Sequence, residues 1–203
     1  MQIKKILPVF SYLFHPIFIS LYGVLMYIQF AQLGINSITL LLLIQVIILT
    51  VLLPLSIYSL MKALGNIQSF TEASIKQRRL PIFLQAAFLF ILIKYNQYMP
   101  QFPALFFFFA GGFIAAIMAL LGTFLNFKVS LHMIGICSLL VFLISLSLYF
   151  NYAALLIIAG FIVITGCVAT SRLYMKSHTI EELVAGAIIG IFSQLAMWQY
   201  FVS

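Results

Sequence analysis

The sequence predicts an all-α protein, a polytopic integral membrane helical bundle of about six or seven transmembrane helices, in a single domain over residues 1–203. Three observations favour this fold class. The chain is 65% hydrophobic and 6% charged, whereas soluble domains average about 45–50% apolar and about 25% charged residues. Its mean hydropathy is +1.23. Apolar stretches close to the about 20 residues that a membrane-spanning helix needs recur along the chain.

Seven stretches have this length and character, or nearly so. They cover residues 9–31, 38–60, 81–97, 104–126, 132–150, 153–170 and 183–202. Lys4 and Lys5 precede the first stretch as in a signal peptide, but it is long and has no clear small-residue cleavage site, so we expect it to be retained. The third is short and holds Lys94 near its end, where the side chain can reach the membrane interface. Asn151 and Tyr152 predict a tight hairpin between the fifth and sixth.

Polar residues gather in three places between these stretches, at residues 61–80, 127–132 and 171–182. Two predicted crossings separate the first place from the second, and two more separate the second from the third. All three should therefore lie on one side of the membrane, together with the N-terminus. That side holds nine of the ten Lys and Arg residues, and the positive-inside rule makes it cytoplasmic. We expect an integral protein of a bacterial inner (cell) membrane with its site on the cytoplasmic face.

Charge and cysteine content limit the possible partners. A net charge of +7 in so apolar a chain favours topology signals and anionic membrane lipids over nucleic acid. Cys137 and Cys167 lie in apolar stretches without metal or redox spacing, so we expect small buried residues. The three acidic residues are too few and too clustered for a two-metal site. No metal and no cofactor is therefore predicted.

The densest polar cluster, residues 171–186, carries two of the three acidic residues and one of the three histidines. Such clusters are costly in a membrane protein and indicate a functional site. His178 and Glu182 are four residues apart, so the carboxylate could orient the imidazole across one helical turn. Two histidines, His132 and His178, are available for a nucleophile and a general acid. The cations that could neutralise a phosphate dianion are Arg79, Arg172, Lys76 and Lys128. This set suits metal-free phosphoryl transfer through a phosphohistidine.

The spacing of these residues resembles the motifs of the type 2 phosphatidic acid phosphatase superfamily of membrane phosphatases. Ser171-Arg172, five residues, His178, three residues and Glu182 follow the family's third motif, which ends in aspartate. The run 129–132, Val-Ser-Leu-His, keeps the serine and histidine of the second motif, Pro-Ser-Gly-His. The first motif, a lysine, six residues and Arg-Pro, is degraded. Arg79 is followed by leucine, and the position seven before it is Glu72, so Lys76 or Arg78 could substitute.

The resemblance covers about residues 72–190 and implies a divergent, all-membrane lipid phosphatase. Its substrate would be a lipid phosphomonoester or diphosphate of the phosphatidic acid, phosphatidylglycerol phosphate or isoprenyl diphosphate type. His178 would attack phosphorus, Glu182 would hold the imidazole in its reactive tautomer, and His132 would protonate the leaving group. The residues that would bind the phosphoryl oxygens are Arg172, Arg79 and Ser130, with Lys76.

Several of these residues also have interpretations without catalysis. Thr179 and Glu182 form Thr-x-x-Glu, a capping box that would open the last helix. Arg78 and Arg79 could anchor the topology. His15-Pro16 predicts a kink in the first helix.

Alternative functions also stay open. The protein could be a lipid phosphotransferase that uses an alcohol in place of water. It could instead be a non-catalytic relative that binds or transports anionic lipids, as the damaged first motif, Leu131 for glycine and Glu182 for aspartate suggest. A transporter is less favoured, because the polar residues gather at one face rather than at the midplane.

Overall fold

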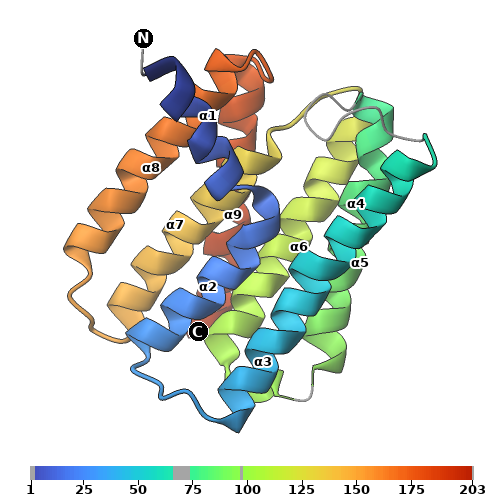
Figure 1. Ribbon diagram of the computed structural model, residues 1–203. Coiled ribbons are helices and arrows are strands. Elements are labelled where there is room, and N and C mark those ends of the chain that lie inside the picture. Colours follow the sequence, from blue (N-terminus) through green and yellow to red (C-terminus); the bar gives the residue numbers. More distant parts are fainter. Residues whose placement is uncertain (1–2, 66–73, 97, 203) are drawn as a thin grey trace.

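The computed structural model describes residues 3–65, 74–96 and 98–202. All regular secondary structure in these residues is helical, which confirms the all-α prediction for the described part of the chain. Figure 1 shows the elements in order. They are α1 Ile3–Leu13, α2 Pro16–Phe30, α3 Ser37–Ile47, the π-helical η1 Ile48–Leu52, α4 Leu53–Ala63, α5 Ile75–Tyr95, the 3₁₀ turn η2 Met99–Gln101, α6 Pro103–Phe124, α7 Leu131–Tyr149, α8 Leu155–Tyr174 and α9 Ile180–Val202.

Within the described residues, five helical stretches are long and apolar enough to cross a membrane. They are Ser37–Ala63, Pro103–Phe124, Leu131–Tyr149, Leu155–Tyr174 and Ile180–Tyr200. The bent pair Ile6–Leu13 and Pro16–Phe30 makes a sixth if it is one broken span. The count in the described residues is therefore five, one below the predicted range, or six, its lower end, if the bent pair is one span. The remaining predicted stretch corresponds to α5, which carries Lys76, Arg78 and Arg79 in its first turns and Lys94 in its last.

The first predicted helix, residues 9–31, is broken at His15, and its two halves are bent by 67°. Proline has no N–H to continue a helix, and it disfavours helical backbone in the residue before it. His15 is accordingly extended, with φ −63° and ψ 140°, and its Nδ1 accepts a hydrogen bond from the Ile17 N–H at 3.4 Å. The bend lays α1 on α8, where the Ser11 and Ser171 hydroxyls are hydrogen-bonded at 2.6 Å.

Short polar side chains begin the helices that frame the site. Ser74 and Gln77 form a capping box at the start of α5. Ser130 begins α7, and its Oγ accepts a hydrogen bond from the Met133 N–H at 3.4 Å. The predicted capping box of the last helix is confirmed, because the Thr179 hydroxyl accepts from the Glu182 N–H at 3.4 Å and the Glu182 carboxylate accepts from the Thr179 N–H at 3.3 Å. These caps satisfy backbone N–H groups that have no partner within the helix.

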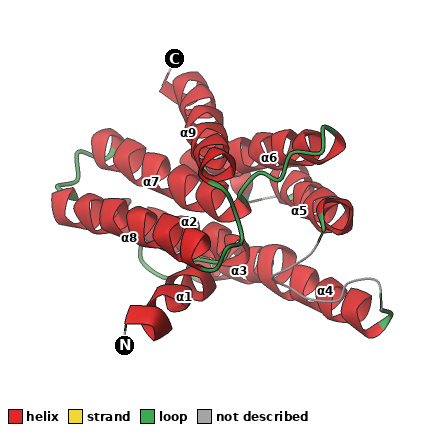
Figure 2. Ribbon diagram, turned by 90° about the horizontal axis from the view of Figure 1, so that it is seen from above, coloured by secondary structure: helices red, strands yellow, loops and turns green. Residues whose placement is uncertain are grey.

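Two glycines bring α9 close to α7. A Cβ atom on Gly186 would lie 2.6 Å from the carbonyl oxygen of Ser130, and one on Gly190 would lie 2.5 Å from that of Ile134. These glycines are four residues apart, a spacing that lets helices approach closely in membrane proteins. Figure 2 shows α9 between α6 and α7, and it packs against both. Close packing at Gly186 therefore holds the start of α9 beside the start of α7.

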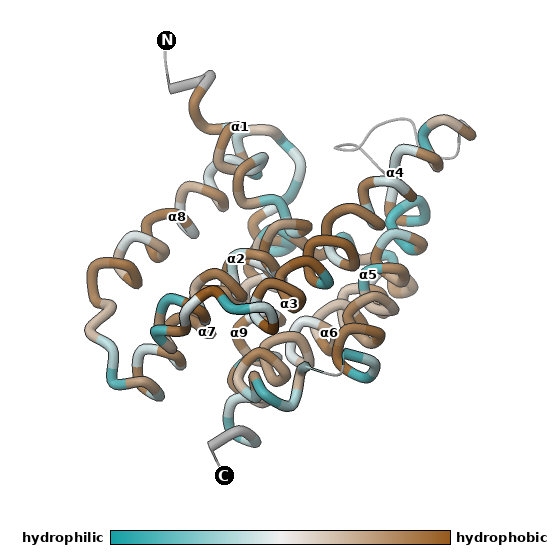
Figure 3. Tube along the Cα trace, turned by 60° about the horizontal axis from the view of Figure 1, so that its bottom comes forward, coloured by the Kyte–Doolittle hydropathy of each residue, from teal (hydrophilic) through white to brown (hydrophobic). Residues whose placement is uncertain are grey.

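The apolar core lies where α2, α6 and α7 meet. Leu105, Leu139 and Leu143 are fully buried there, and the rings of Phe108 and Phe142 are stacked with centroids 4.3 Å apart. Figure 3 shows mainly hydrophobic residues along the helices, with hydrophilic residues concentrated near their ends and connections. The interior therefore offers an apolar support for the polar groups at one end.

The start of α5, the α6–α7 connection and the α8–α9 connection lie at the same end of the bundle as the N-terminus (Figure 1). The sequence predicted this arrangement, because two predicted membrane crossings separate each polar cluster from the next. The predicted convergence of the polar clusters is therefore observed for their described residues. Glu72, where the predicted phosphatase-like core begins, lies outside the described residues.

Candidate functional site

A cavity of about 200 Å³ extends into the bundle from this end. Its charged and titratable lining includes three histidines and two arginines, namely His15, Arg78, His132, Arg172 and His178. These residues come from the α1–α2 junction, α5, α7, α8 and the α8–α9 connection. Of the predicted site residues, His132, Arg172 and His178 therefore line one cavity.

A tight turn at the end of α8 places His178. Lys176 has φ +52°, the left-handed conformation that ends many helices. The Lys176 N–H donates to the Leu173 carbonyl at 2.9 Å, and the Ser177 N–H donates to the Arg172 carbonyl at 3.1 Å. The chain turns back at this point, and α9 begins two residues after His178. The Lys128 Nζ, from the α6–α7 connection, donates to the Ser177 carbonyl at 2.8 Å and holds this turn from the other side.

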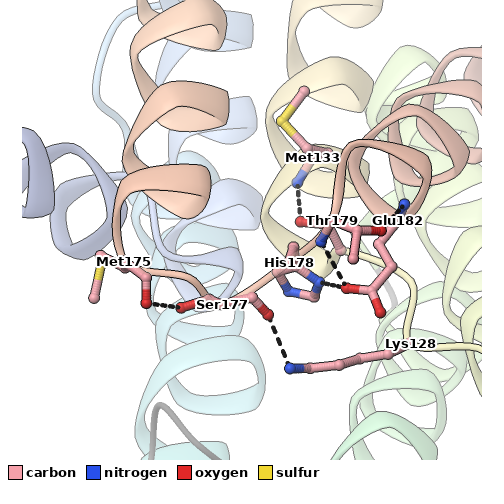
Figure 4. A network of polar contacts seen from close by, with 8 residues as sticks. Lys128, Met133, Met175, Ser177, His178, Thr179 and Glu182 are labelled. Carbon is pink, nitrogen blue, oxygen red and sulfur yellow. Dashed lines mark hydrogen bonds and ion pairs between the residues drawn. The ribbon is translucent and has the colours of Figure 1, made fainter.

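His178 and Glu182 form a close pair at the start of α9, as Figure 4 shows. His178 Nδ1 lies 2.6 Å from Glu182 Oε2, and only 1% of the histidine side chain is exposed. A carboxylate only accepts, so the hydrogen of a neutral ring lies on Nδ1 and the lone pair is left on Nε2. Glu182 also accepts from the Thr179 N–H. One carboxylate therefore both caps α9 and orients the imidazole, so the two interpretations of Glu182 are compatible.

The surroundings keep the His178 imidazole uncharged. Burial is the main cause that lowers its pKa from 6.5 to about 3. The positive charges of Arg78, Arg172 and Lys128 act in the same direction, and a hydrogen bond with the Lys128 backbone acts against them. Burial also lowers the pKa of Lys128. A neutral imidazole at neutral pH has the lone pair that a nucleophile needs.

Arg172 is a buried cation for which the described residues offer no anionic partner. It is 4% exposed, and its Nε has no hydrogen-bond partner. Its Nη1 donates to the Met175 sulfur at 4.0 Å. Among the described residues, no carboxylate lies within ion-pair distance of it. Because an unpaired buried charge is strongly unfavourable, the Arg172 guanidinium at the cavity wall favours an anionic ligand.

The two adjacent arginines of α5 point to different places. Arg78 lines the cavity. The Arg79 Nη2 donates to the Thr123 carbonyl at 2.9 Å, and its guanidinium lies 4.4 Å from the centre of the Phe124 ring. Neighbouring helical residues differ by about 100° around the axis, so the two side chains point in different directions. Lys76 is exposed and is not among the lining residues. The structure therefore places Arg78, and neither Arg79 nor Lys76, at the cavity wall.

The two residues of the second motif also differ in position. Ser130 is fully buried and caps α7, and it is not among the lining residues. His132 lines the cavity, and its Nε2 lies 3.0 Å from the Ser11 carbonyl. A carbonyl only accepts, so Nε2 carries the hydrogen. Any proton that His132 gives to a substrate must therefore leave from Nδ1.

The lining residues that sequence reasoning did not assign to the site include Ser11, Tyr12, His15 and Tyr58. They lie in or beside apolar helices of the first third of the chain. The His15 ring is perpendicular to the His132 ring, with centroids 5.1 Å apart. The His15-Pro16 break was the one available signal, because it interrupts an apolar run. Bending at this break carries Ser11 and His15 to the cavity.

Within the part of the chain that the structure describes, no three His, Cys, Asp or Glu side chains gather as a metal ion would require. Comparisons of the chain with protein-family models, curated proteins and solved structures find no match. The functional argument therefore depends on the residues and on their geometry.

Proposed function

We propose that this protein is an integral membrane enzyme that hydrolyses a lipid phosphomonoester or diphosphate, as a divergent relative of the type 2 phosphatidic acid phosphatases. One observation carries the proposal. His178, which is paired with Glu182, lines one cavity together with the buried Arg172 guanidinium, for which the described residues offer no carboxylate partner. An oriented neutral imidazole beside an unneutralised cation suits attack on a phosphate group. Phosphatidic acid, phosphatidylglycerol phosphate and isoprenyl diphosphates remain the candidate substrates.

The proposed reaction has two steps. In the first, His178 Nε2 attacks phosphorus, an N–P bond forms, and the P–O bond to the lipid breaks. The leaving oxygen takes a proton from His132 Nδ1, once that ring is protonated, or from water. Glu182 stabilises the positive charge on the His178 ring, and Arg78 and Arg172 stabilise the phosphoryl oxygens. In the second step water attacks the phosphohistidine, the N–P bond breaks, and inorganic phosphate leaves. No metal takes part.

The proposed setting is a bacterial cell membrane with the cavity on the cytoplasmic side. The five or six apolar helical stretches among the described residues support the membrane location. The orientation is supported by the basic residues that lie on this side. They are found near the N-terminus, at the start of α5, and in the α6–α7 and α8–α9 connections.

The experiment is phosphate release by detergent-purified protein from a panel of lipid phosphates in the presence of EDTA. His178→Asn is the matched variant, because its amide can donate to Glu182 from the position of Nδ1 while it lacks Nε2. We expect turnover by the wild type, an acid-labile phosphoenzyme, and loss of both in the variant. Turnover that needs a metal, or equal turnover by His178→Asn, would overturn the mechanism.

A second candidate is a non-catalytic protein that binds anionic lipids. It is favoured by the use of His132 Nε2 in the bond to the Ser11 carbonyl and by the capping role of Ser130. The same panel separates the candidates, since this protein would bind lipid phosphates without releasing phosphate. Transfer of the phosphate to an added alcohol, in place of release, would instead identify a lipid phosphotransferase.

A further inference from the structure

The cavity does not end at its basic residues. It continues between the helices, where its lining is apolar and includes Leu89, Phe108, Phe109, Gly112 and Ile134. These residues come from α5, α6 and α7 and belong to the packed interior of the bundle. The charged lining residues, Arg78 and Arg172, lie at the other end. The cavity is therefore amphiphilic along its length.

The cavity is long for its volume. Arg78 and Leu89 both line it from α5, and at about 1.5 Å per residue they are roughly 16 Å apart along the helix. A volume of about 200 Å³ spread over this distance leaves a narrow passage. For comparison, an apolar cavity of about 150 Å³ holds one benzene molecule. The passage thus has room for part of one hydrocarbon chain and not for two chains side by side.

Two polar side chains at the apolar end already donate to the protein backbone. The Gln194 Nε2 donates to the Phe108 carbonyl at 3.0 Å, and the Ser138 hydroxyl donates to the Gly190 carbonyl at 3.2 Å. Both side chains line the cavity, yet their donors are directed to backbone carbonyls. These two side chains therefore have protein partners and do not require a polar ligand group.

We infer that this apolar end binds the hydrocarbon chain of the substrate inside the bundle, so that the preferred ligand is a phosphate or diphosphate carried on a single chain. The inference rests on the proposed function for the phosphate at the basic end. A two-chain lipid would have to leave its second chain outside a passage that is one chain wide, and we expect it to bind more weakly.

Gly112 offers a direct test of chain binding. A Cβ atom there would lie 3.5 Å from Leu89 Cδ1, an ordinary contact, so a larger side chain can enter the cavity without displacing a helix. Gly111 is unsuitable, because its Cβ would lie 2.6 Å from Gln194 Nε2. The control is Gly160 on α8, where a Cβ meets nothing within 4 Å. Replacing glycine by leucine raises the helix propensity by the same amount at Gly112 and at Gly160, so the two variants differ only in what the new side chain meets.

The experiment measures binding of dodecyl phosphate, butyl phosphate and dilauroyl phosphatidic acid to wild type, Gly112→Leu and Gly160→Leu at one detergent concentration. We expect wild type and Gly160→Leu to bind dodecyl phosphate at least about tenfold tighter than butyl phosphate, because each buried methylene adds affinity. Gly112→Leu should lose this preference and keep its affinity for butyl phosphate. Dilauroyl phosphatidic acid should bind wild type more weakly than dodecyl phosphate.

The outcomes separate this inference from the proposed function. An unchanged dodecyl preference in Gly112→Leu would overturn the chain site, and equal affinity for the two-chain lipid would overturn the single-chain preference. Neither result would affect the proposed phosphatase chemistry, since the assay needs no turnover. If wild type binds none of these phosphates, both the proposed phosphate site at the basic end and the chain site that rests on it are refuted. Binding with the expected preferences but without phosphate release would support the chain site and refute only the enzyme.

Discussion

Arg78 and Arg79 are neighbours in the sequence, but their side chains have different surroundings. Arg78 lines the cavity, whereas Arg79 is bound to the end of α6 through Thr123 and Phe124. We predict that Arg78→Gln lowers kcat/KM by about 10- to 100-fold, since a hydrogen bond to a charged group contributes about 1.5–3 kcal/mol. Arg79→Gln should change kcat/KM by less than about threefold. Steady-state kinetics on the same lipid phosphate compare the two, and a larger loss in Arg79→Gln would contradict the placement.

Protonation of His178 should link stability to pH. Its pKa is about 3 in the folded protein and 6.5 in an unfolded chain. Between these values the unfolded state binds a proton that the folded state does not, so stability rises with pH. The contribution is full above pH 6.5 and is lost as the pH falls towards 3, by at most about 1.4 kcal/mol per pH unit. Thermal unfolding in detergent from pH 7 to pH 4 should show a shallower pH dependence in His178→Asn than in wild type. Identical profiles would refute a lowered pKa.

At the scale of elements, the α7–α9 contact decides whether the two motifs meet. Gly186 allows the backbone of α9 to approach the Ser130 carbonyl, and Ser130 begins the helix that carries His132. We predict that Gly186→Ala destabilises the protein by up to about 2 kcal/mol. The added methyl group forces the helices apart at a cost of about 1–3 kcal/mol, and the gain of about 1 kcal/mol in helix propensity offsets part of this cost. Gly166→Ala on α8, where nothing lies within 4 Å, should show only the gain.

Activity adds a second measurement to the Gly186→Ala test. Moving α9 away from α7 shifts His178 and Glu182 relative to His132, and a displacement of about 1 Å can cost on the order of 100-fold in rate. We therefore expect kcat to fall more than thermal stability alone explains, measured at a temperature where the variant is folded. A destabilised variant with unchanged kcat would show that this contact supports the fold only.

At the scale of the whole molecule, the proposed orientation predicts sidedness. Lys176 is exposed in the α8–α9 connection, and Gln101 is exposed in η2 at the other end of the bundle. In a chain whose two native cysteines, Cys137 and Cys167, are replaced by alanine, we expect a membrane-impermeant maleimide to label Gln101→Cys in intact cells. Lys176→Cys should be labelled only after the membrane is opened. The reverse pattern would place the cavity on the outer face.

The sequence by itself determined the features that depend on local chemistry. Apolar runs predicted the membrane helices, because the free energy of moving apolar surface out of water adds up residue by residue along the run. The capping box and the proximity of His178 to Glu182 are contacts within one helical turn, so their spacing was sufficient. The convergence of the polar clusters followed from counting crossings. None of these inferences needed the packing of one helix against another.

Only the tertiary structure decided which side chains face the cavity. Whether Arg78 or Arg79 lines it depends on the rotation of α5 about its axis. That rotation is set by many weak contacts with α6 rather than by any local motif. The burial of Ser130, the bond from His132 to the Ser11 carbonyl and the arrival of His15 all follow from the packing of distant segments. The long narrow cavity has no sequence signature, because its volume is what the packed helices leave unfilled.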